Sequence, residues 1–440
     1  MQEGRKRVLF LPLHRPLRSP GSDQGFCSSQ LLDLIMGHSE STKNEYRRGD
    51  QLALLGGRAV RAKWLPYGHQ SIDNDDIDAV VSVLRSDWIT QGPKVEAFER
   101  AVADYCGSRY AVAFSSGTAA LHAACRAAGL RPSDEVITTP LTFVATANAP
   151  VYCGAKPVFA DIRADTLNID PGEIERAITR QTKAIIPVDF AGHPADLEPI
   201  LSLAKKHNLL VVEDACHALG AEYKNRKVGA ISPMTVFSFH PVKHITTGEG
   251  GMVLSDDKSI AEGLTRLRHH GIDYIDPRRP WRYEISDLGY NYRLSDIHCG
   301  LGISQLQKLD GSISRRQEIA ARYRQAFSHL HGISMPSMSP DVTHAWHLFI
   351  VLLDLSKLTV DRDVVVEALR AENVGATVHY PLVHLQPFYR KRFGYGAGTC
   401  PVAEAIAPRM ITLPIFPSMT DEDVADVVAA LRKVLNFYAV

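Results

Sequence analysis

The sequence predicts an α/β protein with a mostly parallel central sheet in a large domain, followed by a smaller α+β domain. Short apolar runs that suit buried strands recur between residues 110 and 255, with helix-like stretches between several of them. Strands and helices that alternate in this way form a parallel sheet with helices on both faces. After residue 315, one strand (Leu348–Leu353) and two helices (Arg362–Glu372 and Asp421–Phe437) are typical of an α+β arrangement.

The elements of the large domain follow from local patterns. Asp73 precedes apolar residues at helical spacing up to Leu84, which predicts a capped amphipathic helix, and Lys94–Tyr105 predicts a second one. The predicted strands are Tyr110–Phe114, Glu135–Thr139, Lys156–Asp161, Ala184–Phe190, Leu209–Glu213, Thr235–Phe239 and Gly251–Ser255. The predicted helices between them are Ala119–Ala128, Phe143–Tyr152, Pro171–Ile178 and Asp196–His207.

Three segments complete the predicted organisation. Residues 1–64 are rich in Arg, Ser and Gly and have no clear period, so we expect a disordered N-terminal extension, or an upstream start with Met36 as the true first residue. The large domain covers residues 65–315 and the small domain residues 316–440. After a polar stretch (Ile272–Glu284), one long helix from Ile297 to Leu330 contains the boundary near residue 315.

Composition excludes several classes of protein. The 49 basic side chains balance the 49 acidic ones, so no global field attracts nucleic acid or an anionic membrane. No run approaches the roughly 18–20 apolar residues of a membrane span. The seven cysteines are scattered and form no CxxC pair, which argues against a disulfide framework and a zinc site. We therefore expect a cytoplasmic protein without a metal.

The turn Ser115–Thr118 lies between a predicted strand and a predicted helix. Gly117 allows the backbone to approach a ligand, and the free N–H groups at the start of a helix favour a phosphate. Serine and threonine also cap helices where no ligand is present, so this turn alone does not establish a binding site.

Asp214 stands at the end of the apolar run that begins at Leu209. Ligands bind at the carboxyl ends of parallel strands, where an acid can keep a pyridinium nitrogen protonated. A helix cap or a loop acid is the alternative interpretation of a single aspartate at this position.

Lys243 follows a strand, lies among prolines and aromatic residues, and precedes a glycine-rich turn. A lysine nucleophile must be partly desolvated for its amine to be available at neutral pH. Ser238 can add a hydroxyl to a phosphate site, and Phe143 can stack on a flat cofactor ring. The ordinary alternatives are a solvated lysine and an aromatic residue that packs in a core.

Taken together, these residues resemble a known family. In order and spacing, the chain from about Leu65 onward resembles the fold-type I pyridoxal-phosphate (PLP) enzymes of the nucleotide-sugar aminotransferase family. Within it, the likeness is to the UDP-4-amino-4,6-dideoxy-N-acetyl-β-L-altrosamine transaminases of pseudaminic acid synthesis, a pathway of surface polysaccharides. The most specific segments are Thr142–Asn148, Glu213–His217, Phe237–Gly251 and Gly289–Leu294.

The resemblance implies roles for individual residues. Lys243 would be the Schiff-base lysine and proton shuttle, and Asp214 would pair with the pyridine nitrogen. Phe143 would lie on the ring face, with His217 near the ring. The phosphate would be held by Gly117, Thr118 and Ser238, and by Asn291 from a neighbouring subunit, which implies a homodimer. Substrate contacts would come from His344, His347, His379, Tyr380 and His384, although histidine-rich loops also serve as solvated turns or packing sites.

The expected reaction moves an amino group, from glutamate by resemblance, to C4 of a UDP-linked 4-keto-6-deoxy-N-acetylhexosamine. Some members of the family carry histidine in place of the lysine and dehydrate sugars, so Lys243 favours transamination. The alternatives are another nucleotide-linked keto-sugar (3-keto or dTDP-linked) or a non-catalytic module with the same fold. A nicotinamide-dependent oxidoreductase is excluded because no convincing G-x-G-x-x-G turn follows the first strand.

Overall fold

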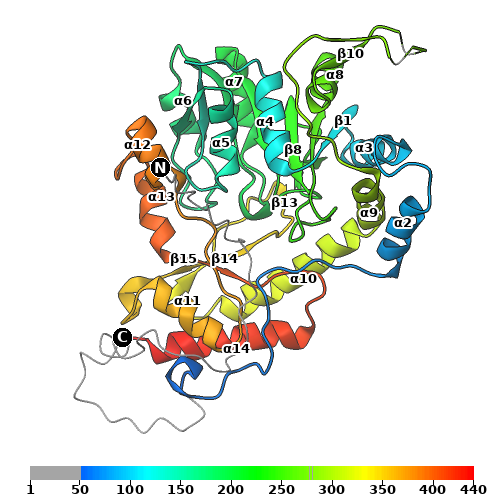
Figure 1. Ribbon diagram of the computed structural model, residues 1–440. Coiled ribbons are helices and arrows are strands. Elements are labelled where there is room, and N and C mark those ends of the chain that lie inside the picture. The colour runs from blue at the N-terminus through cyan, green and yellow to red at the C-terminus, as the bar shows by residue number, and fades with distance from the viewer. Residues whose placement is uncertain (1–50, 277, 280) are drawn as a thin grey trace, which may run out of the picture. The chain divides into compact units, whose positions relative to one another are not determined.

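The computed structural model describes residues 51–276, 278–279 and 281–440. A seven-stranded sheet runs in the order β1-β9-β8-β5-β4-β2-β3, and β9 is antiparallel to both of its neighbours while the other pairs are parallel (Figure 1). The mostly parallel sheet predicted from the sequence is confirmed. Its strands are β1 (Tyr110–Phe114), β2 (Glu135–Thr138), β3 (Lys156–Phe159), β4 (Thr182–Ile186), β5 (Leu210–Asp214), β8 (Met234–Ser238) and β9 (Gly251–Ser255).

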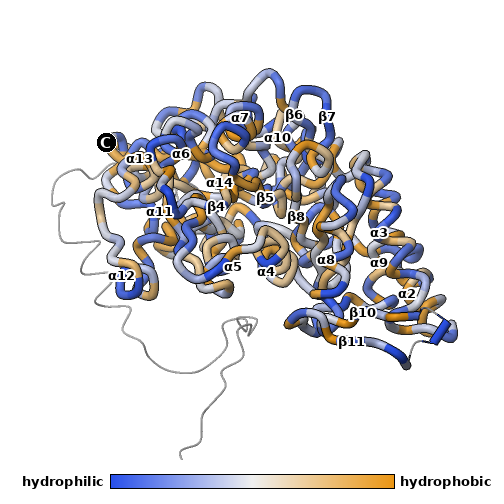
Figure 2. The backbone as a smooth tube through the Cα atoms, turned by 90° about the horizontal axis from the view of Figure 1, so that it is seen from above, coloured by the Kyte–Doolittle hydropathy of each residue, from blue (hydrophilic) through white to orange (hydrophobic). Residues whose placement is uncertain are grey.

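Helices cover both faces of this sheet. On β5, Val212 packs with residues of α4 and α5, whereas its neighbour Val211 packs with residues of α6 and α7. Figure 2 shows α4, α5 and α8 on one side of β4, β5 and β8, and α6 and α7 on the other. Burial on both faces explains the continuous apolar runs of these strands. The helices of this region are α2 (Asn74–Leu84), α3 (Pro93–Cys106), α4 (Gly117–Ala127), α5 (Ala145–Tyr152), α6 (Pro171–Ala177), α7 (Leu197–His207) and α8 (Lys258–Arg268).

Two predicted elements end in different places. The strand predicted to reach Phe190 stops at Ile186, because Pro187 has no N–H to donate to the ladder. The single long helix predicted from residue 297 to 330 is two helices, α9 (Asp296–Gln307) and α10 (Leu309–Phe327). They are separated at Lys308, whose ammonium donates to Asp73 and Asp76 at the start of α2. The predicted domain boundary near residue 315 falls inside α10 and stays a prediction.

The C-terminal part is α+β, as predicted. Its antiparallel sheet runs in the order β12 (Ile333–Ser334), β14 (Phe349–Leu353) and β15 (Met410–Leu413). The core formed by this sheet includes residues of α10, α11 (Arg362–Ala371) and α14 (Asp421–Phe437). The sequence analysis did not predict α12 (Pro387–Phe393), α13 (Pro401–Ile406) or β15.

Residues 51–64 correct the predicted N-terminal extension. Leu52 is fully buried in the C-terminal core, and the backbone N–H groups of Ala53 and Val60 donate to the Glu372 carboxylate at 2.9 and 2.8 Å. The expectation of disorder is therefore wrong for residues 51–64. It failed because contacts with a residue far along the chain hold this segment, which has no period of its own. Residues 1–50 lie outside the described part of the chain.

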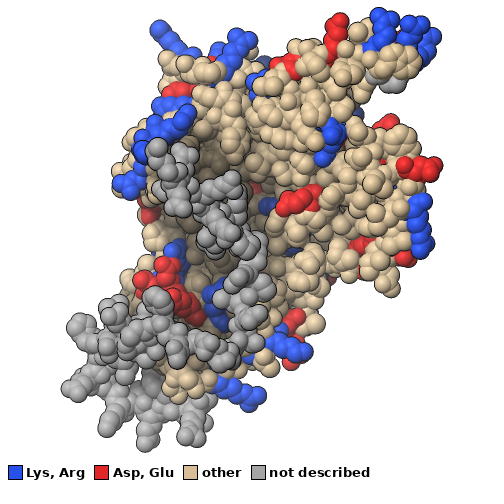
Figure 3. Space-filling model, viewed as in Figure 1, with Lys and Arg blue, Asp and Glu red and all other residues tan. Residues whose placement is uncertain are grey.

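Smaller elements occupy the loops. The polar stretch from Ile272 contains a hairpin of β10 (Ile272–Tyr274) and β11 (Tyr283–Ile285). A second small sheet joins β6 (Glu222–Tyr223), β7 (Arg226–Lys227) and β13 (Val342–Thr343). Acidic and basic side chains are interspersed on the face seen in Figure 3. Within the described residues, no helix has the length and apolar character needed to cross a membrane.

Candidate active site

Asp214 is held firmly at the carboxyl end of β5. The side chain is 4% exposed. Its Oδ2 accepts a hydrogen bond from the Thr146 hydroxyl at 2.6 Å, and its Oδ1 accepts one from the Cys216 backbone N–H at 3.2 Å. Thr146 lies on α5 and is hydrogen-bonded to Thr142 at 2.8 Å. The carboxylate thus has a fixed orientation on the face of the sheet that α5 covers.

Lys243 lies in the loop after the neighbouring strand β8. The loop is tied back on itself, since the Lys243 backbone N–H donates to the His240 carbonyl at 2.9 Å. The residue is partly buried. Burial lowers the pKa of its ammonium, although the nearby Cys216 and Asp214 side chains oppose this effect. Lys243 therefore has the partly desolvated setting that a nucleophilic amine requires.

A central group of aromatic rings, formed by His347, His217 and Tyr380, lies beside the Lys243 ammonium. Its Nζ lies 3.5 Å from His347 Nε2, and the His347 ring packs on His217 with ring centres 4.3 Å apart. His217 Nε2 also contacts the Tyr380 hydroxyl at 3.1 Å. Burial, reinforced by the charge on Lys243, lowers the pKa of both histidines well below the ordinary value. Both rings are therefore neutral at physiological pH.

The turn at the start of α4 approaches the end of β8 closely. Gly117 is the first residue of α4, and a Cβ added to it would lie 2.8 Å from the Cβ of Ser238. Gly251 on β9 has the same property, because its Cβ would lie 2.4 Å from the Ser116 carbonyl oxygen. Thr118 is the next residue of the helix. Free N–H groups and hydroxyls therefore gather at this helix start, as a phosphate site requires.

Phe143 is exposed at the edge of a cavity. Its ring is 55% exposed and lies 5.9 Å from the ring of Tyr380. A cavity of about 650 Å³ is lined by these two residues together with Tyr152, Phe388 and others. An exposed aromatic side chain beside a cavity of this size is available to contact a ligand rather than to fill a core.

The other predicted residues differ in position. His379 belongs with the central group, because its ring contacts Tyr380 at 4.9 Å, and burial lowers its pKa to about 3. His344 stacks on Trp346 at 3.9 Å, and its remaining ring contact is with His193. The contacts of His344 therefore do not include Lys243.

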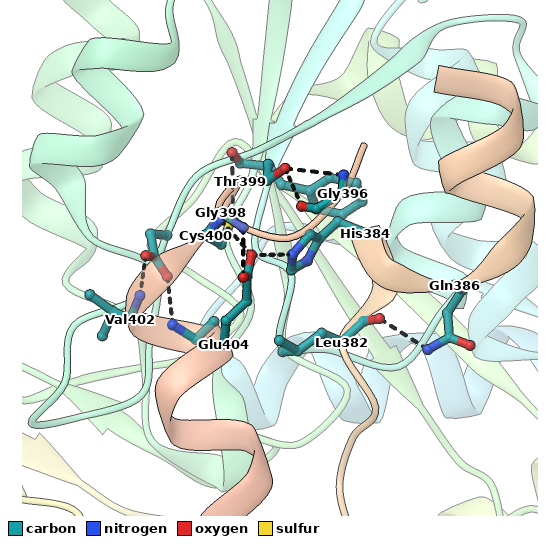
Figure 4. A network of polar contacts seen from close by, with 12 residues as sticks. Leu382, His384, Gln386, Gly396, Gly398, Thr399, Cys400, Val402 and Glu404 are labelled. Carbon is teal, nitrogen blue, oxygen red and sulfur yellow. Dashed lines mark hydrogen bonds and ion pairs between the residues drawn. The ribbon is translucent and has the colours of Figure 1, made fainter. Parts of the chain in front are cut away.

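His384 and Asn291 lie apart from the central group. His384 is fully buried, and its Nε2 contacts Glu404 at 2.9 Å in a network that also holds Gly398 and Cys400 (Figure 4). That network fixes the segment after Tyr380 and gives His384 no contact with the cavity or with Lys243. Asn291 is exposed and forms a backbone bridge with His269, so its predicted role toward a second subunit stays a prediction.

Sequence reasoning missed the group that orients the acid. Thr146 lies within the segment Thr142–Asn148, but the sequence pattern assigns no role to it. Its signal was its spacing from Thr142, since residues four apart lie on one face of a helical turn. No pattern in the sequence indicates that Gly192 packs against the backbone that carries site residues. With φ +98°, Gly192 packs against the backbone of His217, Trp346 and His347, where any Cβ would lie within 2.9 Å.

Comparisons with known proteins identify the family of this chain. A model of the DegT/DnrJ/EryC1/StrS aminotransferase family matches residues 70–432. The chain is 43% identical over 382 residues to the spore coat polysaccharide biosynthesis protein SpsC of Bacillus subtilis, covering 86% of this chain and 98% of that protein.

Two solved structures extend the comparison. PseC of Helicobacter pylori, an aminotransferase involved in the biosynthesis of pseudoaminic acid, matches with a TM-score of 0.81 and 34% identity, covering 86% of this chain and all of that one. The PLP form of Spr1654 of Streptococcus pneumoniae, a putative sugar aminotransferase, matches with a TM-score of 0.79 and 31% identity, covering 85% and 99%.

Proposed function

The chain belongs to the DegT/DnrJ/EryC1/StrS aminotransferase family, and we propose that it transfers an amino group from L-glutamate to C4 of a UDP-linked 4-keto-6-deoxy-N-acetylhexosamine. Membership makes it a PLP-dependent sugar aminotransferase. When bound, PLP supplies an aldehyde that takes up amino groups and a ring that accepts electrons from the adjacent carbon. The donor, the sugar and the roles of individual residues form the proposal.

The residues present fit each part of this cofactor. The start of α4 with Gly117, Thr118 and Ser238 suits a phosphate, and Gly117 is the residue that allows Ser238 to lie against this turn. Asp214, oriented by Thr146, suits a protonated ring nitrogen. Phe143 is exposed and available for the ring face. His217 fits a position beside the ring, because its Nδ1 is buried and has no partner among the described residues.

Lys243 carries the proton chemistry in this proposal. Because burial lowers the pKa of its ammonium, a larger fraction of the side chain is neutral amine near neutral pH. A neutral amine can bond to an aldehyde carbon, remove a proton from the α-carbon of the donor and return a proton later. The observation that carries the proposal is that Asp214 ends β5 and Lys243 follows the adjacent parallel strand β8, close enough for the Asp214 charge to raise the pKa of the lysine.

Three further observations support the choice of sugar. PseC, with 34% identity along nearly the whole chain, acts in pseudoaminic acid biosynthesis. SpsC, with 43% identity, acts in spore coat polysaccharide biosynthesis. The cavity of about 650 Å³ beside Phe143 and Tyr380 lies within the ordinary range of small-molecule sites. These observations favour a nucleotide-linked sugar of surface polysaccharide synthesis.

The test follows the visible absorbance of the PLP-loaded protein. We expect the absorbance to bleach with L-glutamate and to return when the UDP-linked 4-keto sugar is added, with a 4-amino sugar detected by mass spectrometry. Recovery only with a 3-keto or dTDP-linked sugar would reject this substrate and leave the family activity in place. A protein that takes up PLP but never bleaches with any amino acid would instead be a non-catalytic module.

We also propose a homodimer in which Asn291 acts in the site of the partner. Asn291 is exposed, so its side chain is accessible to a second subunit. The test mixes Lys243→Ala and Asn291→Ala proteins, each inactive alone. If subunits exchange at random, about half the dimers are mixed and contain one intact site, so about a quarter of the wild-type activity should return. No recovery despite measured subunit exchange would reject sharing of the site.

The reaction is proposed to take place in the cytoplasm. Six cysteines in the described residues are free thiols, and five of them are buried. Free thiols in such number are typical of a reducing compartment.

A further inference from the structure

His347 contacts Lys243 but has no role in the reaction as proposed above. We propose that His347 is the proton carrier of Lys243, accepting a proton at Nε2 from the lysine ammonium and returning it when the lysine must be charged. The inference rests on the proposed function. It concerns this chain's own side chains and can be examined before any substrate is added.

The position of His347 is fixed by its neighbours along the chain. The backbone N–H groups of Ala345 and Leu348 donate to the carbonyls of Gly192 and Ala191 at 2.9 and 3.1 Å. The carbonyl of Ala345 also contacts His244 Nε2 at 3.0 Å. His347 itself is 5% exposed. A buried segment bonded on both sides of His347 keeps the imidazole at a constant distance from Lys243.

The residue before His347 adds to this rigidity. Trp346 has a φ of +51°, in the left-handed region that L-residues other than glycine rarely occupy. Its carbonyl accepts a hydrogen bond from the fully buried Arg316 guanidinium at 3.1 Å, and its N–H donates to His344 Nδ1 at 2.9 Å. Strained backbone that several partners hold in place is typical of functional positions, and here its effect is to turn His347 toward the lysine.

The tautomer of His347 follows from its contacts. To accept from an ammonium, Nε2 must carry the lone pair, so the proton of the neutral ring is on Nδ1. Nδ1 is buried and has no hydrogen-bond partner among the described residues. No carboxylate stabilises the charged ring through Nδ1, as happens in a Ser-His-Asp triad. His347 can therefore hold a proton only briefly, which is what a carrier requires.

The charges that face the pair agree with this assignment. Burial lowers the pKa of His347, and the positive charges of Lys243 and Arg316 lower it further. On the lysine side, burial lowers the pKa of the ammonium, whereas Cys216 and Asp214 raise it. Both side chains therefore bind a proton more weakly than they would in water, so a proton that passes from Lys243 to His347 is readily returned.

The step balances in atoms and charge. The Nζ–H bond of the ammonium breaks and leaves its electron pair on nitrogen, while the Nε2 lone pair of His347 forms the new N–H bond. One positive charge moves from Lys243 to His347, and the total is unchanged. The neutral amine can then act as a nucleophile or base, and the reverse transfer restores the ammonium.

The first measurement is the titration of Lys243 in the cofactor-free protein. The rate at which trinitrobenzenesulfonate modifies this one lysine is followed by peptide mass spectrometry from about pH 6 to pH 10. His347→Phe removes the acceptor and should lower the apparent pKa of Lys243 by about one unit. His347→Gln keeps an acceptor oxygen and should leave that pKa near the wild-type value. The matched control is His193→Gln, which alters another buried histidine that has no contact with Lys243 and should not move this pKa.

The second measurement is the bleaching rate of the PLP-loaded protein in a single turnover with L-glutamate. Both His347 variants should lose about 100-fold in rate, because neither can take up a proton. An unchanged Lys243 titration in His347→Phe, or wild-type bleaching in His347→Gln, would overturn the proposal. If His347→Phe does not fold, the rate of His347→Gln decides alone. Failure of the proposed function would appear as absence of bleaching in the wild type, with the titration unaffected.

Discussion

The buried acid pair of Asp189 and Glu213 makes a sharp prediction about stability and pH. Both side chains are 0% exposed, each carboxyl shifts the pKa of the other, and Asp189 Oδ2 and Glu213 Oε1 are buried with no hydrogen-bond donor among the described residues. A proton on one of the two carboxyls would supply the missing donor. Burial raises the pKa of both groups, and for Asp189 the charge of Glu213 adds to the effect. The folded protein thus keeps one proton in the pair.

The sign of the effect follows from the two states of the chain. In the unfolded chain, Asp and Glu release their protons near the ordinary pKa values of 3.8 and 4.5. The folded pair keeps its shared proton to higher pH. Its contribution to stability is therefore full below about pH 4 and is lost as the pH rises through the raised folded pKa. Because one proton is involved, the slope is at most about 1.4 kcal/mol per pH unit.

Glu213→Gln removes this dependence while keeping the contact. The amide can donate an N–H to Asp189 and still accept from the Thr235 hydroxyl, which now lies 3.0 Å from Glu213. Urea unfolding of both proteins is compared from about pH 5 to pH 9. The free energy of unfolding of the variant should rise relative to that of the wild type by up to about 1.4 kcal/mol per pH unit. Asp189→Asn should behave in the same way. Parallel curves for wild type and variants would refute a shared proton.

Three further predictions test other parts of the structure. Glu372→Ala should destabilise the protein by about 3 kcal/mol, measured by urea unfolding, because it leaves the partly buried Lys433 ammonium without its carboxylate, with only the Arg58 carbonyl as an acceptor among the described residues, and frees the segment at Ala53. Gly192→Ala should lower both the Tm and the bleaching rate with glutamate, since a Cβ at φ +98° would clash with backbone at 2.8–2.9 Å; an unchanged rate would show that the site tolerates displacement of His347. Asp214→Asn should still bind PLP but lose about 100-fold or more in single-turnover rate, because it removes the charge that faces the ring nitrogen; wild-type bleaching would remove this role.

The central sheet could be predicted because short stretches of sequence determine its strands. Strands such as β1 and β9 are apolar runs closed by turns, and their bounds were predicted without error. Errors arose where a distant contact decides the structure. Residues 51–64 are held by Glu372, and α9 and α10 separate where Lys308 reaches the cap of α2. Such contacts join residues that are far apart along the chain, so a short stretch of sequence does not reveal them.

The candidate site divides in the same way. That Asp214 and Lys243 lie near each other could be inferred from the sequence, because Asp214 ends one strand, Lys243 follows the next strand in the sheet, and the ends of neighbouring parallel strands meet. The histidines could not be ranked from the sequence, since all of them lie in loops of similar composition. The structure separates them: His347 contacts Lys243, whereas His384 pairs with Glu404 in another network. The role of each histidine therefore depends on whether the backbone of its loop places the ring beside Lys243.

The burial of several neutral histidines around one lysine has a common electrostatic consequence. Among the described residues, no carboxylate pairs with these rings, so each protonated ring would add positive charge that is not neutralised, and the Asp214 oxygens already accept from Thr146 and Cys216. Burial keeps His217, His347 and His379 uncharged, so Asp214 remains free to balance a positive charge on a ligand. A pocket lined with permanent cations would instead compete with the ligand for that one carboxylate. The same burial that weakens the histidines as bases therefore preserves the charge pairing on which the proposed reaction depends.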